Sequence, residues 1–182
     1  MNAPIGKGSI SQRIIFIDRD GVITKERKDY VKNVDELEIL SGVPEDLARL
    51  NRNGFNLIVV TNQSVVNRGL LTHEGLYEIH QRMLCELSKR GCTIQAIYYC
   101  PHRPDEHCDC RKPSPSMLFK AAEEFNIDLA DSWMIGDNDM DVQAGKQAGC
   151  KAFKVQTNEA LSLSKAVSHI LHAEGKIGLD SD

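Results

Sequence analysis

Two carboxylates stand two positions apart near the start of the chain, in the segment FIDRDGVIT, as Asp18 and Asp20. Three more, Asp137, Asp139 and Asp141, follow the apolar part of SWMIGDNDMD. An isolated acidic pair is most simply explained as part of a turn. Two acidic groups that each follow an apolar strand can instead converge on one site. Such a site can hold a hard divalent cation such as Mg2+, which prefers oxygen ligands.

Groups that suit a phosphoryl moiety occur in two further segments. VVTNQS carries the hydroxyl of Thr61 and the amides of Asn62 and Gln63, which can hydrogen-bond phosphoryl oxygens. CRKPSP carries Arg111, a bidentate phosphate partner, and Lys112, a compact point charge. Phosphate oxygens suit both these cations and a bound Mg2+. The residues together therefore indicate a site for a phosphorylated ligand.

A second set of chemically active residues lies in the stretch CPHRPDEHCDCRKP, which has three cysteines and two histidines. Zn2+ binds Cys3His sets tetrahedrally, and structural zinc sites are closed by four protein ligands. The spacing predicts a structural zinc site made by Cys100, His102, Cys108 and Cys110. His107 is an alternative ligand, but it directly precedes Cys108 and breaks the paired CxH and CxC pattern.

Two rival interpretations of this cluster are a redox device and an unrelated set of thiols and imidazoles. Their density argues against an unrelated set, and a redox role lacks a CxxC motif. A catalytic zinc is disfavoured because four protein ligands leave no open position for water. The three remaining cysteines, Cys85, Cys92 and Cys150, are scattered singly and are predicted to be small buried hydrophobic residues.

The elements that must position these residues alternate along the chain. Five apolar runs rich in β-branched and aromatic residues predict strands, namely RIIFID, FNLIVVTN, TIQAIYYC, SWMIGD and CKAFKV. Between them lie predicted helices at 44–54, 72–89, from 115 onward and at 139–149. This alternation predicts an α/β, Rossmann-like parallel sheet with helices on both faces, which binds ligands at the carboxyl ends of its strands. After Val155 we expect a short surface helix, to which no chemistry is assigned.

Bulk composition narrows the function classes. The 182 residues predict a single domain with a core at about 14–155, and the net charge of -4 argues against a broad nucleic-acid-binding face. No apolar run approaches the length of a membrane span, and the N-terminal segment lacks the apolar centre of a signal peptide. We therefore expect a cytoplasmic monomer that binds neither nucleic acid nor membrane, with its cysteines reduced.

Four short motifs, DRDG, TNQ, RKP and GDNDMD, occur in that order, each at or near a predicted strand end. Together they resemble the four motifs of the haloacid dehalogenase superfamily of phosphatases, over about residues 14–155. A single motif of this kind carries little information, whereas four in order are specific. The resemblance implies a phosphatase that works through an enzyme-bound aspartyl-phosphate.

Carried over onto this chain, the resemblance implies that Asp18 attacks phosphorus. Asp20 would protonate the leaving oxygen and then deprotonate the hydrolytic water. Thr61 and Lys112 would hold the phosphoryl oxygens, and Mg2+ would be bound by Asp18, Asp137 and the backbone carbonyl of Asp20.

The two later acids of GDNDMD have a separate expectation. Asp141 stands where the family often carries a second acid, which would join the metal shell or orient Lys112. Either Asp139 or Asp141 can instead simply cap or solvate the first turn of the following helix. Such a role in the first turn is the expectation for Asp139, and both roles stay open for Asp141.

The cysteine loop followed by CDCRKP resembles one capless branch of this superfamily, whose members act on heptose bisphosphates or on histidinol phosphate. The segment between Asp20 and Pro44 is too short for a cap domain and predicts only a flap. The resemblance implies removal of the 7-phosphate of D-glycero-D-manno-heptose 1,7-bisphosphate, a small phosphorylated sugar, with histidinol phosphate as the alternative substrate. It places these residues against the substrate: Arg27, Lys28, Asp29, Tyr30, Asn62, Gln63, Ser64, Arg111 and Asn138.

Two alternatives accompany this interpretation. Arg27 and Lys28 can equally be a solvated run of charge. The whole chain can also be a zinc-stapled module that binds phosphorylated ligands without turnover. The complete set of Asp18, Asp20, Lys112 and Asp137 argues against the second alternative.

Overall fold

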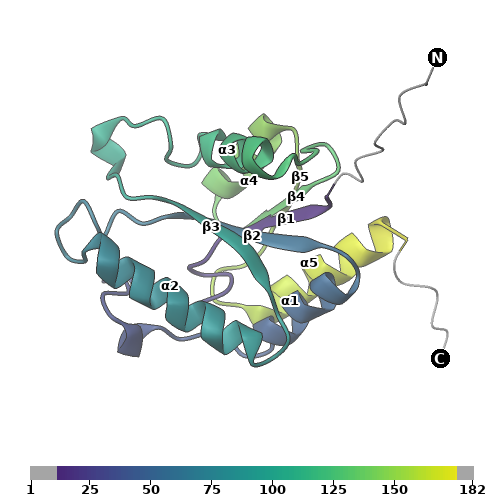
Figure 1. Cartoon of the computed structure of the whole chain (residues 1–182), viewed down its shortest axis with the longest axis horizontal. Coiled ribbons are helices and arrows are strands. Elements are labelled where there is room, and N and C mark those ends of the chain that lie inside the picture. Colours follow the sequence, from purple (N-terminus) through teal and green to yellow (C-terminus); the bar gives the residue numbers. More distant parts are fainter. Residues whose placement is uncertain (1–11, 176–182) are drawn as a thin grey trace, which may run out of the picture.

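Five parallel strands form one sheet in the order β3-β2-β1-β4-β5 (Figure 1). The computed structural model describes residues 12–175. The strands lie where the apolar runs predicted them, at Ile14–Ile17 (β1), Asn56–Asn62 (β2), Ile94–Cys100 (β3), Trp133–Gly136 (β4) and Lys151–Lys154 (β5). All four strand pairings are parallel, as the alternation of strands and helices predicts.

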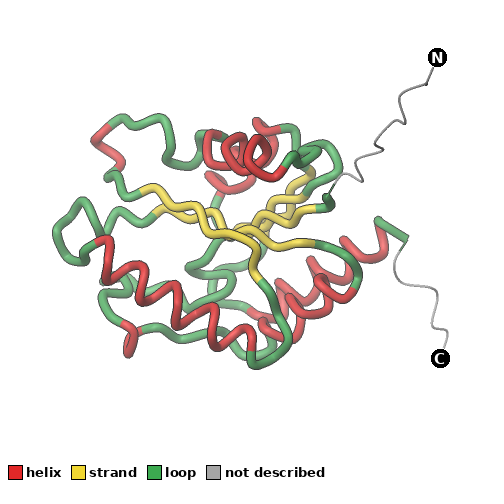
Figure 2. The backbone as a smooth tube through the Cα atoms, in the orientation of Figure 1, coloured by secondary structure: helices red, strands yellow, loops and turns green. Residues whose placement is uncertain are grey.

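Five helices cover the two faces of the sheet. The predicted helices are confirmed to within a few residues, and α3 and α4 lie on one face while α1, α2 and α5 lie on the other (Figure 1). Figure 2 shows these two helical layers on either side of the strands. The bounds are Val43–Arg52 (α1), His73–Ser88 (α2), Ser116–Phe125 (α3), Asp139–Ala148 (α4) and Ala160–Ala173 (α5).

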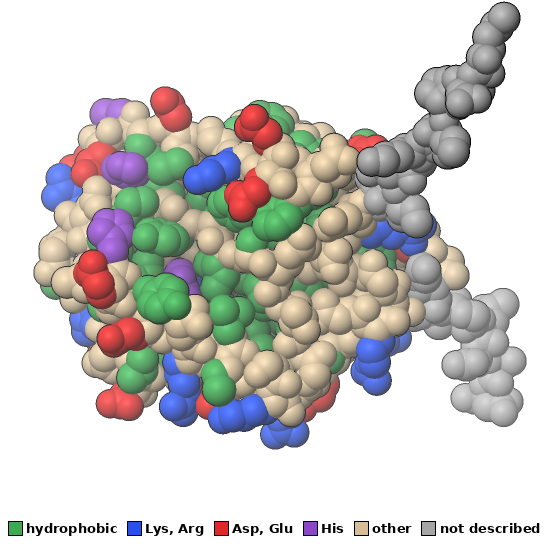
Figure 3. All heavy atoms as spheres, viewed as in Figure 1, with side chains coloured by type: hydrophobic (Ala, Val, Ile, Leu, Met, Phe, Trp, Pro, Cys, Tyr) green, Lys and Arg blue, Asp and Glu red, His purple; other side chains and the backbone are tan. Residues whose placement is uncertain are grey.

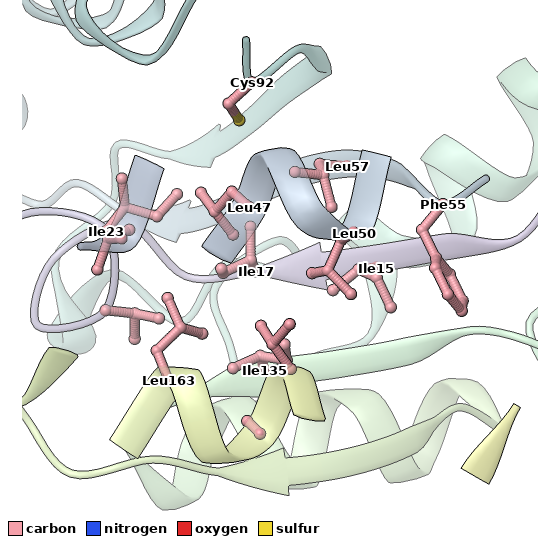
Figure 4. Packing of buried hydrophobic residues seen from close by; sticks show 14 of the residues in the cluster. Ile15, Ile17, Ile23, Leu47, Leu50, Phe55, Leu57, Cys92, Ile135 and Leu163 are labelled. Atoms are coloured by element: carbon pink, nitrogen blue, oxygen red, sulfur yellow. The ribbon is translucent and has the colours of Figure 1, made fainter. Parts of the chain in front are cut away.

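Alternating side chains of the central strand fill both cores. Ile15 and Ile17 belong to the cluster under α1 and α5, whereas Ile14 and Phe16 belong to the cluster under α3 and α4. All four are fully buried, because successive residues of a strand point to opposite faces and both faces are covered. Figure 4 shows Ile15 and Ile17 among the side chains of α1, with Leu163 of α5 below them.

The last helix is more than a surface element. Leu163, Val167 and Ile170 of α5 are buried against the sheet and α1, so the hydrophobic core continues past Val155, where the sequence placed its end. An amphipathic helix near a chain end reads as a surface helix from sequence alone. Its packing partner α1 lies more than 100 residues earlier in the chain.

The order of the strands brings the predicted motifs together. The chain proceeds from the central strand β1 outward to β2 and β3, then crosses back to β4 on the other side of β1. The carboxyl ends of β1, β2 and β4 therefore meet, which is where open α/β sheets bind ligands. The connection from β1 to α1 is a flap with one short 3-10 turn, Val34–Glu36. Within residues 12–175, no helix has the length and apolar character of a membrane span.

Candidate active site

A buried lysine lies at the centre of the site. Nζ of Lys112 is 2.8 Å from Oδ1 of Asp18 and 2.6 Å from Oδ1 of Asp141, and it donates to the carbonyl of Val60 at 2.7 Å. The side chain of Lys112 is only 2% exposed. Burial alone would lower the pKa of Lys112, but the two carboxylates outweigh it and raise that pKa above its ordinary value. Lys112 is thus a fixed positive charge beside Asp18.

Asp18 at the end of β1 is the most perturbed acid of the site. Burial, only partly opposed by Lys112, raises the pKa of Asp18 to about 7, and the negative charge of Asp141 adds to the rise. Burial also raises the pKa of Asp137. One carboxylate oxygen each from Asp18, Asp137 and Asp141 lies within 4.8 Å of the others. These three converging carboxylates form an oxygen-only donor set, which fits a divalent cation such as Mg2+.

Close packing of backbone against carboxylates explains two glycines of the motifs. Gly21 has a φ of +82°, and a Cβ there would lie 2.3 Å from Oδ2 of Asp137. A Cβ on Gly136 would lie 2.2 Å from Cβ of Asp141. The loop after β1 and the start of α4 approach each other this closely only because these positions carry no side chain. Gly21 and Gly136 thereby bring the acids of β1 and α4 into one site.

The helix geometry of α4 separates the roles of its two acids. Oδ2 of Asp141 accepts from the backbone N–H of Asn138 at 2.9 Å, while Oδ1 faces Lys112. Asp141 therefore caps the helix and orients Lys112 at the same time. Asp139 points to solvent, where its only described ion pair is with Lys154 at 2.7 Å, consistent with the role in the first helical turn expected for it.

The TNQ segment at the end of β2 joins the parts of the site. Nε2 of Gln63 donates to Oγ1 of Thr61 at 2.8 Å and to Oδ2 of Asp20 at 2.7 Å. Asn62 makes a reciprocal pair of bonds with the backbone of Lys112, at 3.1 and 3.2 Å. Its amide therefore positions the lysine, although the sequence assigned Asn62 to substrate contact.

Two buried residues next to Asp20 were missed by sequence reasoning. Arg19 is 1% exposed, and its guanidinium grips both oxygens of Asp20, at 3.0 and 2.8 Å. His80 of α2 is 5% exposed, and its Nε2 lies 3.2 Å from Nη1 of Arg19. Burial and the adjacent guanidinium lower the pKa of His80 to about 3, so this imidazole is neutral. The only sequence signal was Arg19 itself, which stands between the two acids of DRDG and shows no role of its own there.

These groups open onto a cavity of about 410 Å3 at the carboxyl end of the sheet. Residues outside the prediction also line it, among them Glu26, Arg68, Met140 and Thr157. The guanidinium of Arg68 lies 5.7 Å from the centre of the Tyr30 ring, which ties the β2 loop to the flap. The predicted site residues that line the cavity are Asp18, Asp20, Arg27, Lys28, Tyr30, Thr61, Asn62, Gln63, Ser64, Arg111, Lys112, Asp137 and Asn138.

One predicted flap residue is placed elsewhere. Asp29 is not among the residues that line the cavity, and its exposed carboxylate pairs with Lys32 at 2.7 Å and with Arg27 at 3.5 Å. Its described ion pairs are thus with two cations close to it in the sequence. Arg27 and Lys28 line the cavity but are exposed, so their contact with the substrate stays a prediction.

The loop after β3 brings the four predicted zinc ligands together. Sγ of Cys100 lies 3.5 Å from Sγ of Cys108 and 3.1 Å from Sγ of Cys110, while Nδ1 of His102 lies 3.2 Å from Sγ of Cys110. These separations are close to the edges of a tetrahedron with metal–ligand bonds of about 2.0–2.3 Å. His107 is exposed and stands outside the group. The donor set and its geometry fit a closed Zn2+ site.

This loop also supports the cavity. Nη1 of Arg111 donates to the backbone carbonyl of His102 at 3.1 Å, so a residue of the predicted zinc set holds the guanidinium that lines the cavity.

The three scattered cysteines differ among themselves. Cys92 and Cys150 are buried as predicted, whereas Cys85 is exposed on α2, so the prediction for Cys85 was wrong. An isolated cysteine in a helical segment does not show from sequence alone whether it lies on the outer side of the helix.

Comparisons with known proteins place the chain in a family. The profile of the HAD-hydrolase-like family matches residues 109–169. Similar proteins include the D-glycero-beta-D-manno-heptose-1,7-bisphosphate 7-phosphatases of Pseudomonas aeruginosa, 36% identical over 84% of this chain and 85% of the relative, and of Bordetella bronchiseptica, 40% identical over 80% and 81%.

Solved structures give the same picture. The crystal structure of D,D-heptose 1,7-bisphosphate phosphatase from B. bronchiseptica, complexed with magnesium and phosphate, superposes with a TM-score of 0.83 at 34% identity and covers 88% of this chain and 99% of its own. The corresponding enzyme of Burkholderia thailandensis superposes with a TM-score of 0.61 at 32% identity, covering 85% and 84%.

Proposed function

The chain belongs to the haloacid dehalogenase-like hydrolases and is a phosphatase, and we propose that it removes the 7-phosphate of D-glycero-D-manno-heptose 1,7-bisphosphate. The observation that carries the substrate is the charge distribution of the cavity. Lys112 and the carboxylates around it form one part of the cavity wall. The cationic side chains of Arg27, Lys28, Arg68 and Arg111 line the same cavity. A second cationic region suits a substrate with a second phosphate, which histidinol phosphate lacks. We infer that the occupant is such a small sugar, and that neither nucleic acid nor membrane is a partner.

In the proposed reaction, a carboxylate oxygen of Asp18 attacks phosphorus and the bond from phosphorus to the sugar oxygen breaks. The leaving oxygen takes its proton from Asp20. Asp20 then removes a proton from the water that attacks phosphorus in the aspartyl-phosphate, which releases phosphate and restores Asp18. Thr61 and Lys112 hold the phosphoryl oxygens throughout, because their positions at the ends of β2 and beside Asp18 are fixed by hydrogen bonds.

The metal proposals rest on the two donor sets. Asp18 and Asp137, with the backbone carbonyl of Asp20, would hold Mg2+, which supplies positive charge for the phosphoryl group. Both oxygens of Asp141 are engaged by Lys112 and the N-terminus of α4, so we assign this acid to orienting the lysine rather than to the metal. Cys100, His102, Cys108 and Cys110 would hold Zn2+ in a structural role. A cytoplasmic location and a monomeric state stay predictions.

Removal of zinc should loosen the cavity as well as the loop. After zinc is stripped with a chelator, we expect the melting temperature to fall by at least about 5 °C and KM for the bisphosphate to rise, because the carbonyl that holds Arg111 is no longer anchored. Thermal unfolding, metal content and steady-state kinetics measure this. The Cys85→Ser variant, altered at an exposed thiol outside the cluster, serves as the control. An unchanged melting temperature after zinc loss would rule out the structural role.

The substrate assignment is tested by kcat/KM with Mg2+ on both anomers of the heptose bisphosphate, on the heptose 7-phosphate and on histidinol phosphate. We expect the bisphosphate to be preferred over histidinol phosphate by at least about 100-fold, the value of a well-made charged contact. The Arg111→Gln variant should lose activity on the bisphosphate while changing little on the 7-phosphate. A preference for histidinol phosphate would overturn the assignment.

A further inference from the structure

The carboxylate of Asp20 is surrounded by donors. Oδ1 accepts from Nε of Arg19 at 3.0 Å and from Oγ1 of Thr24 at 3.1 Å. Oδ2 accepts from Nη2 of Arg19 at 2.8 Å and from Nε2 of Gln63 at 2.7 Å. A carboxylate offers about four lone-pair positions. All of them are occupied here, so the direction of this side chain is set by its neighbours.

The guanidinium that grips Asp20 is itself held from the opposite side. Arg19 is 1% exposed, and its remaining contacts are Oε1 of Gln63 at 2.9 Å and Nε2 of His80 at 3.2 Å. Arginine only donates hydrogen bonds, so Nε2 of His80 accepts, and the neutral ring carries its proton on Nδ1. The low pKa of His80 agrees with a neutral ring. An edge contact with Tyr99, with ring centres 5.9 Å apart, fixes the ring plane.

A purely structural pair accounts poorly for this arrangement. A buried ion pair contributes little net stability compared with apolar residues of similar size, because both charges lose their hydration. Here the buried guanidinium of Arg19 contacts the buried imidazole of His80, which comes from a helix 61 positions away. This series of contacts ends on the carboxylate of Asp20, which faces the cavity. Series of this kind align a reacting group.

We propose that Arg19 and His80 are positioning residues for Asp20, a role that rests on the proposed function of Asp20 as the acid that protonates the leaving oxygen. His80 holds the guanidinium, and the guanidinium holds the carboxyl group in line with the departing oxygen. When Asp20 carries its proton, one of the four hydrogen bonds to its carboxylate is lost. The Arg19–His80 pair then keeps the side chain of Asp20 in the same orientation. His80 does not line the cavity, and Arg19 lines it while only 1% exposed, so both residues act through Asp20.

The test compares leaving groups, because an acid matters for an alkoxide and hardly at all for p-nitrophenolate, which leaves without a proton. We expect kcat/KM for the heptose bisphosphate to fall about 100-fold in Arg19→Met and about 10-fold in His80→Phe. For p-nitrophenyl phosphate it should change by less than about threefold in each. The ratio kcat/KM reports only the steps up to loss of the leaving group, so the later role of Asp20 as base does not enter.

Conservative variants and a benchmark separate positioning from damage. His80→Gln retains a carbonyl that can accept from Arg19, and it should recover most of the activity lost in His80→Phe. Asp20→Asn must show the same leaving-group selectivity. If Asp20→Asn is selective and the Arg19 and His80 variants lower both substrates equally, or neither, the inference is wrong while the proposed function stands. If the wild type does not turn over the bisphosphate, the proposed function fails, and any alkyl phosphate that it hydrolyses replaces the bisphosphate in the test.

Discussion

The Asp18→Asn variant should fold normally and release no phosphate above background, a loss in kcat of at least about 10,000-fold. The asparagine amide keeps the size of the side chain and can still accept a hydrogen bond from Lys112. It has no anionic oxygen with which to attack phosphorus. Phosphate release with Mg2+ and the heptose bisphosphate measures the loss, and circular dichroism checks the fold.

The chain supplies a matched control for this change. Asp139→Asn also converts an acid of one of the four motifs, but that side chain is 76% exposed and pairs only with Lys154 among the described contacts. We expect this variant to keep wild-type activity. Substantial turnover by Asp18→Asn would refute a covalent mechanism through this residue.

The Lys112→Met variant should be both inactive and unstable. Removing the ammonium leaves two carboxylates, Asp18 and Asp141, close together without their counter-charge. Loss of one partner of a buried ion pair typically costs about 3–5 kcal/mol. We therefore expect the free energy of unfolding, measured by urea denaturation at pH 7, to fall by that amount.

A second substitution should reverse part of this loss. In Lys112→Met/Asp141→Asn one of the two uncompensated charges is removed. We therefore expect about half of the lost free energy of unfolding to be recovered, while activity stays absent. Lys154→Met is the control, since this half-exposed lysine and its exposed partner Asp139 should contribute less than about 1 kcal/mol. Equal stability of Lys112→Met and the wild type would show that the buried pair does not hold the site together.

Most of the site could be predicted because its residues follow apolar strands. Asp18, Thr61 and Asp137 directly follow runs that can only be buried strands, and parallel strands place their ends side by side. The zinc ligands were equally accessible, since Cys100 to Cys110 form one local loop. In both cases local spacing determines the geometry.

The residues that sequence reasoning missed depend on contacts between distant segments. His80 lies on the inner side of an amphipathic helix, where a histidine is indistinguishable from an ordinary core residue until Arg19 is placed beside it. Asp139 points to solvent whereas Asp141 points to Lys112, because each residue of a helix is rotated by about 100° from the one before it. The sequence of letters does not display this rotation. Asp29 was assigned to the substrate by resemblance, and no motif in the sequence marks its ion pair with Lys32.

The covalent step at Asp18 is the central claim, and it can be observed directly in the Asp20→Asn variant. With p-nitrophenyl phosphate the first step needs no acid, whereas the aspartyl-phosphate waits for a base. We expect a burst of about one p-nitrophenol per enzyme in rapid-mixing experiments. Acid quench, borohydride reduction and peptide mass mapping should then find homoserine at position 18. Steady release without a burst, together with an unmodified Asp18, would contradict the mechanism.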